Sequence, residues 1–366
     1  MKSSEAKRFI EIVPAKGRGA LSNRESRFLE AGREIDLAYL DSIRDDVPAA
    51  TVRTETTFVE ATSIISRNTS PDIGFDRSIN PFLGCEHGCI YCYARPSHAY
   101  LGLSPGLDFE TRLSAKTNAA ELLRHELSRR AYEPRFIALG ANTDPYQPIE
   151  RDARISRAVL EVLAEFNHPV AITTKSALVV RDIDILAPMA SKGLARVAIS
   201  LATTDGSIAR AMEPRANSPA RRLQAIEQLA AAGIPTTVIV APIVPALTDA
   251  TMEHVIERAA AAGADSAGYV VLRLPLEVRD LFVEWLEAHF PLRARHVMSI
   301  VNQMRGGKDY DSEFGTRMKG TGPFSELIAQ RFRLACARHG LNRERKVLRT
   351  DLFQVPAAGT NQMDLF

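Results

Sequence analysis

Six short apolar runs alternate with longer helical patterns across the middle of this 366-residue chain, and no other feature constrains the fold as strongly. The runs are SINPFLG (78–84), RFIALG (135–140), PVAITT (169–174), RVAISL (196–201), TTVIVAP (236–242) and AGYVVLRL (267–274). Each is too apolar to face water, and strands that alternate with helices are typical of parallel sheets. We therefore predict an α/β fold, a partial (βα)6 TIM-type barrel, with an open doubly wound sheet as the alternative.

Helical patterns fill the intervals, and their ends carry recognisable signals. They cover residues 117–131, 152–166, 180–191, 219–232, 249–262 and 276–289. Ser218 before Pro219 predicts an N-cap and a first-turn proline, and Gly233 followed by Pro235 predicts the end of the same helix.

The chain divides into three predicted regions. Residues 1–58 are polar and weakly periodic, so we expect a partly mobile N-terminal extension before a core at 59–290. Residues 291–350 hold 13 Lys or Arg against 5 Asp or Glu, a charge of +8 that leaves −6 for the rest. We expect this basic C-terminal segment, 291–366, to cover the barrel mouth. Its charge favours an acidic partner such as nucleic acid, and the alternative is an ordinary solvated surface.

The bulk composition describes a soluble globular protein, with 45% hydrophobic and 25% charged residues. No stretch approaches the roughly 20 apolar residues of a membrane span, and the first residues lack the apolar core of a secretory signal. We expect a cytoplasmic protein. Four cysteines, three of them clustered, fit a reducing compartment and metal binding better than disulfides.

The clustered cysteines lie in GCEHGCIYCYARP, directly after the first predicted strand. Cys85, Cys89 and Cys92 have C-x3-C-x2-C spacing, and thiolates select zinc, copper(I) or iron–sulfur clusters. A structural zinc site or a ferredoxin cluster takes four ligands. His87 or His98 could complete a zinc site. Three thiolates alone would instead leave one iron of a [4Fe–4S] cluster open to a non-protein ligand.

These motifs resemble a known family. The pattern C-x3-C-aromatic-x-C after the first strand of a six-fold βα series resembles the radical S-adenosylmethionine (SAM) superfamily. SINPFLGCEHGCIYCYARP, GANTDPYQPIE and SLATTD are similar, more narrowly, to its DNA repair photolyase-like group, which is related to spore photoproduct lyase. The resemblance covers residues 60–335.

The resemblance implies a specific chemistry. A [4Fe–4S] cluster on the three cysteines would cleave SAM reductively, and the 5′-deoxyadenosyl radical would take a hydrogen atom from an unidentified substrate, with a nucleic-acid lesion as first candidate. It also implies a one-electron donor of the flavodoxin or ferredoxin type. A peptide- or RNA-modifying radical SAM enzyme and a non-catalytic iron–sulfur or zinc protein that binds nucleic acid are the alternatives.

Candidate cofactor-binding residues follow from the resemblance. Tyr91 would flank the adenine, or it simply packs the cysteine loop. Asn142, Thr143 and Asp144 stand where many members carry a Gly-Gly-Glu element for the SAM amino group, and the alternative is a cap for the next turn.

Two further residues lie at strand ends. Lys175 would pair with the SAM carboxylate, or it is solvated. Ser200 would bind SAM, or it bonds a neighbouring carbonyl.

The substrate radical needs a hydrogen donor, for which Cys336 and Tyr310 are the candidates. Cys336 follows Phe332 by four residues and Ile328 by eight, which also predicts a buried core thiol. Arg215 and Arg273 are candidate anion-binding residues, with salt bridges as the alternative.

Overall fold

A curved seven-stranded sheet forms the centre of the protein. The computed structural model describes residues 16–24, 27–28, 52–344 and 346–356. The strand order is β10-β9-β8-β7-β6-β3-β2. These strands are β2 (Ile65–Arg67), β3 (Arg77–Ile79), β6 (Ile137–Leu139), β7 (Val170–Thr174), β8 (Ala195–Ser200), β9 (Thr236–Ile243) and β10 (Ser266–Val271). Neighbours from β3 to β10 pair in parallel, and β2 is antiparallel to β3. The predicted partial barrel is therefore confirmed.

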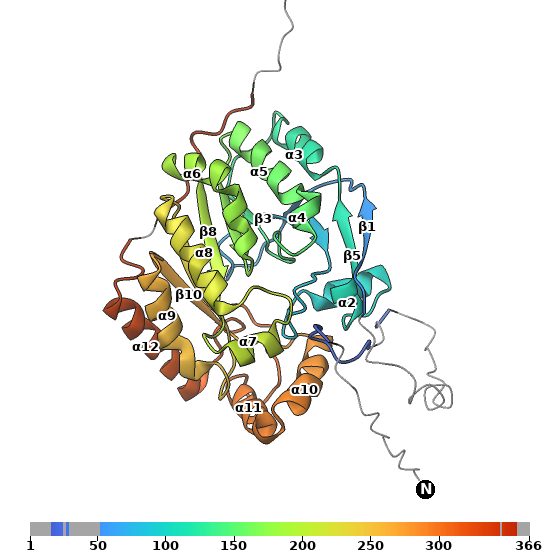
Figure 1. The fold of residues 1–366 in the computed structure, drawn as a ribbon, viewed down its shortest axis with the longest axis vertical. Coiled ribbons are helices and arrows are strands. Elements are labelled where there is room, and N and C mark those ends of the chain that lie inside the picture. The colour runs from blue at the N-terminus through green and yellow to red at the C-terminus, as the bar shows by residue number, and fades with distance from the viewer. Residues whose placement is uncertain (1–15, 25–26, 29–51, 345, 357–366) are drawn as a thin grey trace, which may run out of the picture.

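Helices cover the outside of this sheet (Figure 1). They are α3 (Ala119–Leu127), α4 (Glu150–Ala153), α5 (Ile155–Glu165), η2 (Ala177–Asp182), α6 (Ile183–Ser191), α8 (Pro219–Ala231), η3 (Asp249–Thr251), α9 (Met252–Ala261) and α12 (Gly322–Arg338). The predicted signals of α8 are confirmed, because the Ser218 side chain accepts the N–H of Arg221 and Gly233 adopts a φ of 74°. No helix in the described part of the chain is long and apolar enough to cross a membrane.

The first predicted strand is wrong as a single element. Residues 78–84 divide into β3 and β4 (Phe82–Leu83), which belong to different sheets. Pro81 lies between them and lacks the N–H that a continuous ladder needs. β4 joins a small sheet in the order β1-β5-β4, with β1 at Glu55–Val59 and β5 at Arg112–Lys116. Beside it lie η1 (Arg95–Leu101) and α2 (Asp108–Thr111), and this unit flanks the barrel (Figure 1).

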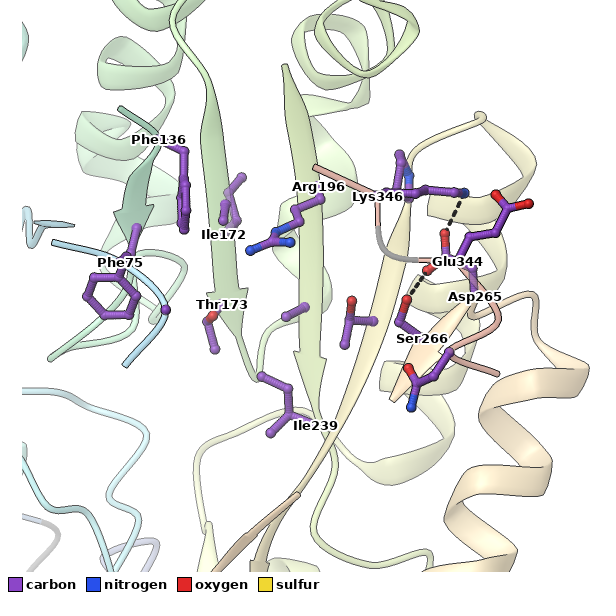
Figure 2. A pocket seen from close by; sticks show the side chains of 17 residues that line it. Phe75, Phe136, Ile172, Thr173, Arg196, Ile239, Asp265, Ser266, Glu344 and Lys346 are labelled. Atoms are coloured by element: carbon purple, nitrogen blue, oxygen red, sulfur yellow. Dashed lines mark hydrogen bonds and ion pairs between the residues drawn. The ribbon is translucent and has the colours of Figure 1, made fainter. Parts of the chain in front are cut away.

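The inner face of the barrel carries small side chains that leave an open lumen. Burial alternates along β7, β8 and β9, with apolar residues packed under the helices and half-exposed residues facing inward. Ala138, Ala171, Thr173 and Ala198 line a cavity of about 470 Å³. TIM barrels usually fill this space with bulky branched residues. At the base of the lumen, the Arg196 guanidinium lies 5.2 Å from the Phe136 ring centre (Figure 2).

The C-terminal region reaches both ends of the barrel. α10 (Glu277–His289), α11 (Pro291–Gln303) and the short α7 (Gly206–Met212) share a second apolar core. The loop after α11 lies at the carboxyl end of β10, where the Val271 N–H bonds the Met318 carbonyl at 2.9 Å. Residues 342–344 and 346–356 lie at the opposite end, because the Arg349 N–H bonds the carbonyl of Gly193, just before β8. The domain boundaries at residues 58 and 290 remain predictions.

Candidate functional site

The three cysteines lie in one tight loop, which we call the cluster loop and define as residues 84–95. Gly84 opens it with a φ of 75°, and a Cβ there would lie 2.9 Å from the Phe109 carbonyl. The loop then turns three times, since the N–H groups of Gly88, Cys92 and Arg95 bond carbonyls three residues earlier. The loop therefore follows β4 of the small sheet, rather than a strand of the barrel as predicted, and folds back on itself.

The thiols of the cluster loop suit a bound metal better than water. Cys85 and Cys89 are buried, Cys92 is partly exposed, and Cys85 and Cys92 share a small apolar cluster with Phe109. Burial raises the pKa of Cys89 to about 12, and also raises the pKa of Cys85. A metal deprotonates coordinating thiols, so a metal cluster would supply the positive charge that makes buried thiolates stable here. Three soft donors on one loop fit an iron–sulfur cluster.

In the part of the chain that the structure describes, no fourth protein ligand lies ready beside this loop. Cys336 is buried in the core between α12 and the sheet, where burial raises its pKa to about 11. The His98 Nε2 lies 2.9 Å from the Arg112 carbonyl, and the His87 Nδ1 lies 3.3 Å from an Asp144 oxygen. Within the described ranges, no group of three or more His, Cys, Asp or Glu side chains is arranged to hold a single metal ion.

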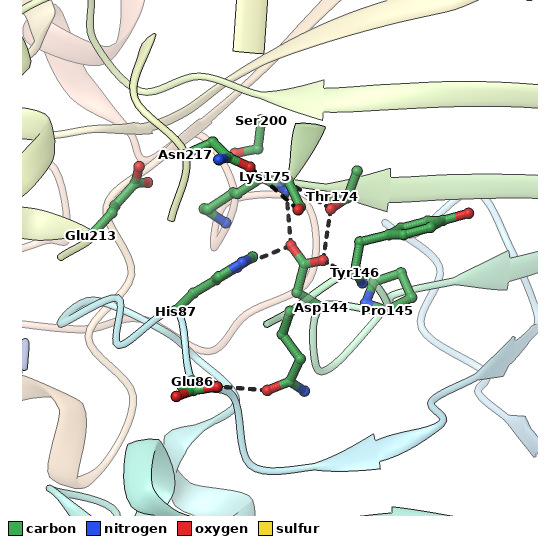
Figure 3. Close-up of polar contacts among 12 residues, drawn as sticks. Glu86, His87, Asp144, Pro145, Tyr146, Thr174, Lys175, Ser200, Glu213 and Asn217 are labelled. Atoms are coloured by element: carbon green, nitrogen blue, oxygen red, sulfur yellow. Dashed lines mark hydrogen bonds and ion pairs between the residues drawn. The ribbon is translucent and has the colours of Figure 1, made fainter. Parts of the chain in front are cut away.

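Asp144 is the centre of a polar network at the ends of β6 and β7 (Figure 3). Its carboxylate accepts the Thr174 hydroxyl at 2.6 Å, the Lys175 N–H at 2.8 Å and the Tyr146 N–H at 2.9 Å. Burial alone would raise the pKa of Asp144, but His87 and these donors hold it below its usual range. Asp144 therefore positions the loops, as the capping alternative predicted, and contacts the cluster loop through His87.

The two residues before Asp144, Asn142 and Thr143, differ in whether their side chains are free to bind a ligand. The Thr143 hydroxyl donates to the Phe82 carbonyl at 2.8 Å and is buried. The Asn142 N–H donates to the Asn80 side chain, and its own amide group has no hydrogen-bond partner among the described residues. Of the predicted trio, Asn142 alone has a side chain free to bind a ligand.

Lys175 extends from the end of β7 towards the cluster loop and Glu213 (Figure 3). Its Nζ lies 5.8 Å from the Tyr91 ring centre and has no hydrogen-bond partner in the described part of the chain. Burial would lower the pKa of Lys175, but Cys89, Glu213 and Asp144 outweigh burial and raise it. The side chain is therefore a charged amine with free donors beside the cysteines, which is suited to binding a carboxylate.

A buried ion pair holds Tyr91 of the cluster loop in place. Arg222 on α8 pairs with Glu213, and Glu213 accepts a hydrogen bond from the Tyr91 hydroxyl. Arg222 Nη1 also donates to the Ser200 carbonyl at 2.9 Å. The Ser200 hydroxyl lies 3.3 Å from the Ala241 carbonyl and is buried, as the alternative interpretation of Ser200 predicted. Tyr91 is thus fixed next to Cys92 by a group that lies far away in sequence.

Tyr310 lies at the barrel mouth, two contacts from the cluster loop. Its hydroxyl is 3.3 Å from Arg273 Nη2, and the Arg273 guanidinium lies 5.4 Å from the Tyr93 ring centre. Arg215 pairs with Glu86 at 2.5 Å, so its default as a salt bridge holds. The structure thus brings together Tyr91, Lys175 and the three cysteines, brings Tyr310 near them through Arg273, and leaves Cys336 in the core.

Sequence reasoning missed Glu213 and Arg222 as parts of the site, and considered His87 only as a zinc ligand. Glu213 lies in the loop that follows α7, and Arg222 lies on α8. The sequence does contain one sign of the Arg222 ion pair, because a charged residue on the apolar face of a predicted helix needs a buried partner. The identity of that partner depends on how the loop folds.

Comparisons with known proteins agree with this geometry. Residues 79–259 match the family model described as the radical SAM superfamily. Uncharacterized proteins of Mycobacterium bovis and Mycobacterium tuberculosis are 39% identical over 225 residues, 61% of this chain and 66% of theirs. A Methanocaldococcus jannaschii relative is 28% identical over 178 residues, 49% of this chain and 63% of its own. The chain spans about two thirds of the length of the mycobacterial relatives that it matches.

Solved structures share the fold. Spore photoproduct lyase complexed with dinucleoside spore photoproduct superimposes with a TM-score of 0.55 at 16% identity, covering 78% of this chain and 80% of that one. A variant of that enzyme with bound AdoMet and the same dinucleoside gives 0.51 at 16%, covering 75% and 78%. The open barrel and its three-cysteine loop define a radical SAM domain. Through the match over residues 79–259, the chain belongs to the radical SAM superfamily.

Proposed function

We propose that this protein is a radical SAM enzyme that holds a [4Fe–4S] cluster on Cys85, Cys89 and Cys92 and acts on a nucleic-acid lesion or nucleotide. When bound, the cluster supplies the electron that cleaves SAM to methionine and a 5′-deoxyadenosyl radical, which removes a hydrogen atom from the substrate. The observation that carries the proposal is the juxtaposition of three thiols with the open amine of Lys175, at the end of the barrel where the carboxyl ends of the strands meet.

Three side chains of this site would bind SAM. The Lys175 amine would bind the carboxylate, because its charge is maintained by Cys89 and Glu213 despite burial. The Asn142 amide, half-exposed beside it, would hydrogen-bond the amino group. Tyr91 would contact the adenine through its ring, whose orientation is fixed by Glu213. Ser200 stays a weaker candidate, since its hydroxyl already lies against a carbonyl.

The lumen would receive the reacting part of the substrate. Its cavity of about 470 Å³ lies in the range of ligand pockets. Ala171, Thr173 and Ala198 line its walls, and Arg196, Asp265, Glu344 and Lys346 line it at the end opposite the cysteines. A radical needs a site that excludes water and holds donor and acceptor in contact. A single base or nucleotide fits such a space, whereas a duplex does not.

Fewer basic side chains are available to bind nucleic acid than the charge of +8 in residues 291–350 indicates, because several of them are paired within the protein. Arg305 bonds the Leu272 carbonyl, Arg317 pairs with Asp72, and Arg331 pairs with Glu253. Arg293 and Arg295, on the exposed face of α11, have no ion-pair partner among the described residues. This face would contact phosphates near the barrel mouth.

The hydrogen donor to a product radical would be Tyr310 rather than Cys336. Tyr310 lies beside Arg273 at the mouth, whereas Cys336 lies in the apolar core outside the lumen. A buried core thiol is inert toward a substrate that it cannot touch.

Labelled substrates test the proposed function. We expect the anaerobically reconstituted protein to form 5′-deoxyadenosine from SAM under reduction, with deuterium transferred from a lesion-containing oligonucleotide labelled at the damaged base. The Cys89→Ala variant is the control and should bind little iron while keeping its helical content.

Other outcomes favour other functions. Deuterium transfer from peptides or intact RNA, and not from damaged DNA, would assign the protein to peptide or RNA modification. Stoichiometric zinc without SAM cleavage would reject the enzyme and favour a nucleic-acid-binding protein.

A further inference from the structure

A short N-terminal segment packs directly against the cluster loop, although about 60 residues separate the two in sequence. We call residues 16–24 the N-terminal strap. Arg18, Ala20 and Leu21 are buried, and Ala20 shares an apolar core with Ile90 of the cluster loop. A Cβ at Gly19 would lie 1.8 Å from the Gly88 carbonyl oxygen. The two backbones are therefore in contact, and the contact admits only glycine at position 19.

Glu110 connects the strap to the cluster loop. This carboxylate is fully buried and accepts the Gly19 N–H at 2.9 Å and the Ala20 N–H at 2.8 Å. It also pairs with Arg95, which is fully buried as well. Arg95 Nε donates to the Cys89 carbonyl at 2.9 Å and its Nη2 donates to the Gly88 carbonyl at 3.2 Å.

The strap extends this contact along the neighbouring loop. Arg18 Nη1 donates to the Glu110 carbonyl at 3.0 Å, and the Asn23 side chain exchanges two hydrogen bonds with Asp108. A Cβ at Gly106 would lie 2.1 Å from the Ser22 carbonyl oxygen. The strap thus makes several backbone-level contacts within residues 106–110, and its position is fixed by more than one of them.

We propose that the N-terminal strap and Glu110 position the cluster loop, so that the backbone of Gly88 and Cys89 is ordered before any metal binds. Glu110 is a positioning residue in this scheme, because it acts through Arg95 and the loop carbonyls. A buried carboxylate that lost its two strap donors would be undersatisfied, and the water that entered to solvate it would compete with Arg95 and loosen its hold on the loop. The role of the ordered loop in binding a cluster rests on the proposed function, whereas the positioning of its backbone by the strap does not.

Alkylation of the cysteines in the full-length chain, freed of metal and kept reduced, measures this order directly. The variant is Gly19→Ala, and the matched control is Gly206→Ala, where a Cβ meets nothing within 4 Å. Cys336 in the core reports global unfolding in the same sample. We expect iodoacetamide to modify Cys85 and Cys89 about tenfold faster in Gly19→Ala, with Cys336 and the control variant unchanged. Glu110→Gln should act in the same direction.

The outcomes separate the strap from the proposed function. Unchanged alkylation rates of Cys85 and Cys89 in Gly19→Ala and Glu110→Gln would overturn the inference. Equal acceleration at Cys336 would also overturn it, because the strap would then stabilise the whole fold. A wild-type chain that binds no iron on reconstitution would contradict the proposed function, yet the alkylation result would still decide the role of the strap.

Discussion

Lys175 shows how one residue of the site is tuned by its surroundings. Burial opposes its positive charge, but Cys89, Glu213 and Asp144 raise its pKa above the ordinary value. Its backbone N–H is held by Asp144, which fixes the start of the side chain. Because the Nζ has no hydrogen-bond partner in the residues that the structure describes, its charge is available to a ligand.

Replacing this amine should weaken SAM binding specifically. We expect Lys175→Met to lower SAM affinity about tenfold or more, since a charge-assisted hydrogen bond is lost. Titration calorimetry on reconstituted protein with matched iron content measures this. Lys192→Met is the control, because Lys192 is exposed and bonds Asn167 far from the site. Equal SAM affinity in Lys175→Met and wild type would exclude the carboxylate contact.

At the scale of single residues, the sequence identified the cysteine loop but not the residues that hold it in place. The cysteines form a local pattern, so Cys85, Cys89 and Cys92 could be read directly from their spacing. Glu110 and Glu213 could not, because each acts through a partner that tertiary folding brings to it. Cys336 was correctly expected to be buried by its helical spacing.

Among the secondary-structure elements, the barrel strands are unusual because several of the side chains on their inner faces are small. Ala171, Thr173 and Ala198 face the lumen, while the alternate residues pack under the helices. The same parallel pairing that makes a TIM barrel solid therefore encloses a cavity here.

Filling this cavity should separate SAM cleavage from substrate reaction. We expect Ala198→Phe to retain iron and slow, uncoupled formation of 5′-deoxyadenosine, while transfer of deuterium from substrate falls at least about tenfold. Mass spectrometry of the 5′-deoxyadenosine measures both. Ala198→Ser is the matched control. Undiminished deuterium transfer in Ala198→Phe would mean that the substrate binds elsewhere.

The elements were largely predictable because their signals are local. Five of the six predicted strands correspond to strands of the barrel, the first divides between the two sheets, and α5, α8 and α10 fall within two or three residues of their predicted bounds. The small sheet of β1, β5 and β4 was missed. β1 pairs with β5 across more than 50 residues, and β4 has only two residues, so neither leaves a periodic pattern.

For the whole molecule, the net charge of the C-terminal segment is a poor guide to how much positive charge its surface exposes. Several basic side chains of the C-terminal segment form internal ion pairs, and residues 342–344 and 346–356 lie at the end of the barrel opposite the cysteines. The distribution of charge in space depends on pairing that composition does not record.

In the enzyme that we propose, three protein thiolates hold a cluster whose remaining iron binds SAM. Electron paramagnetic resonance of the anaerobically reconstituted, reduced protein tests it most directly, with and without SAM. We predict a [4Fe–4S]⁺ signal that changes when SAM is added and that disappears in Cys92→Ala. A signal unaffected by SAM, or a protein that binds only diamagnetic zinc, would contradict the account.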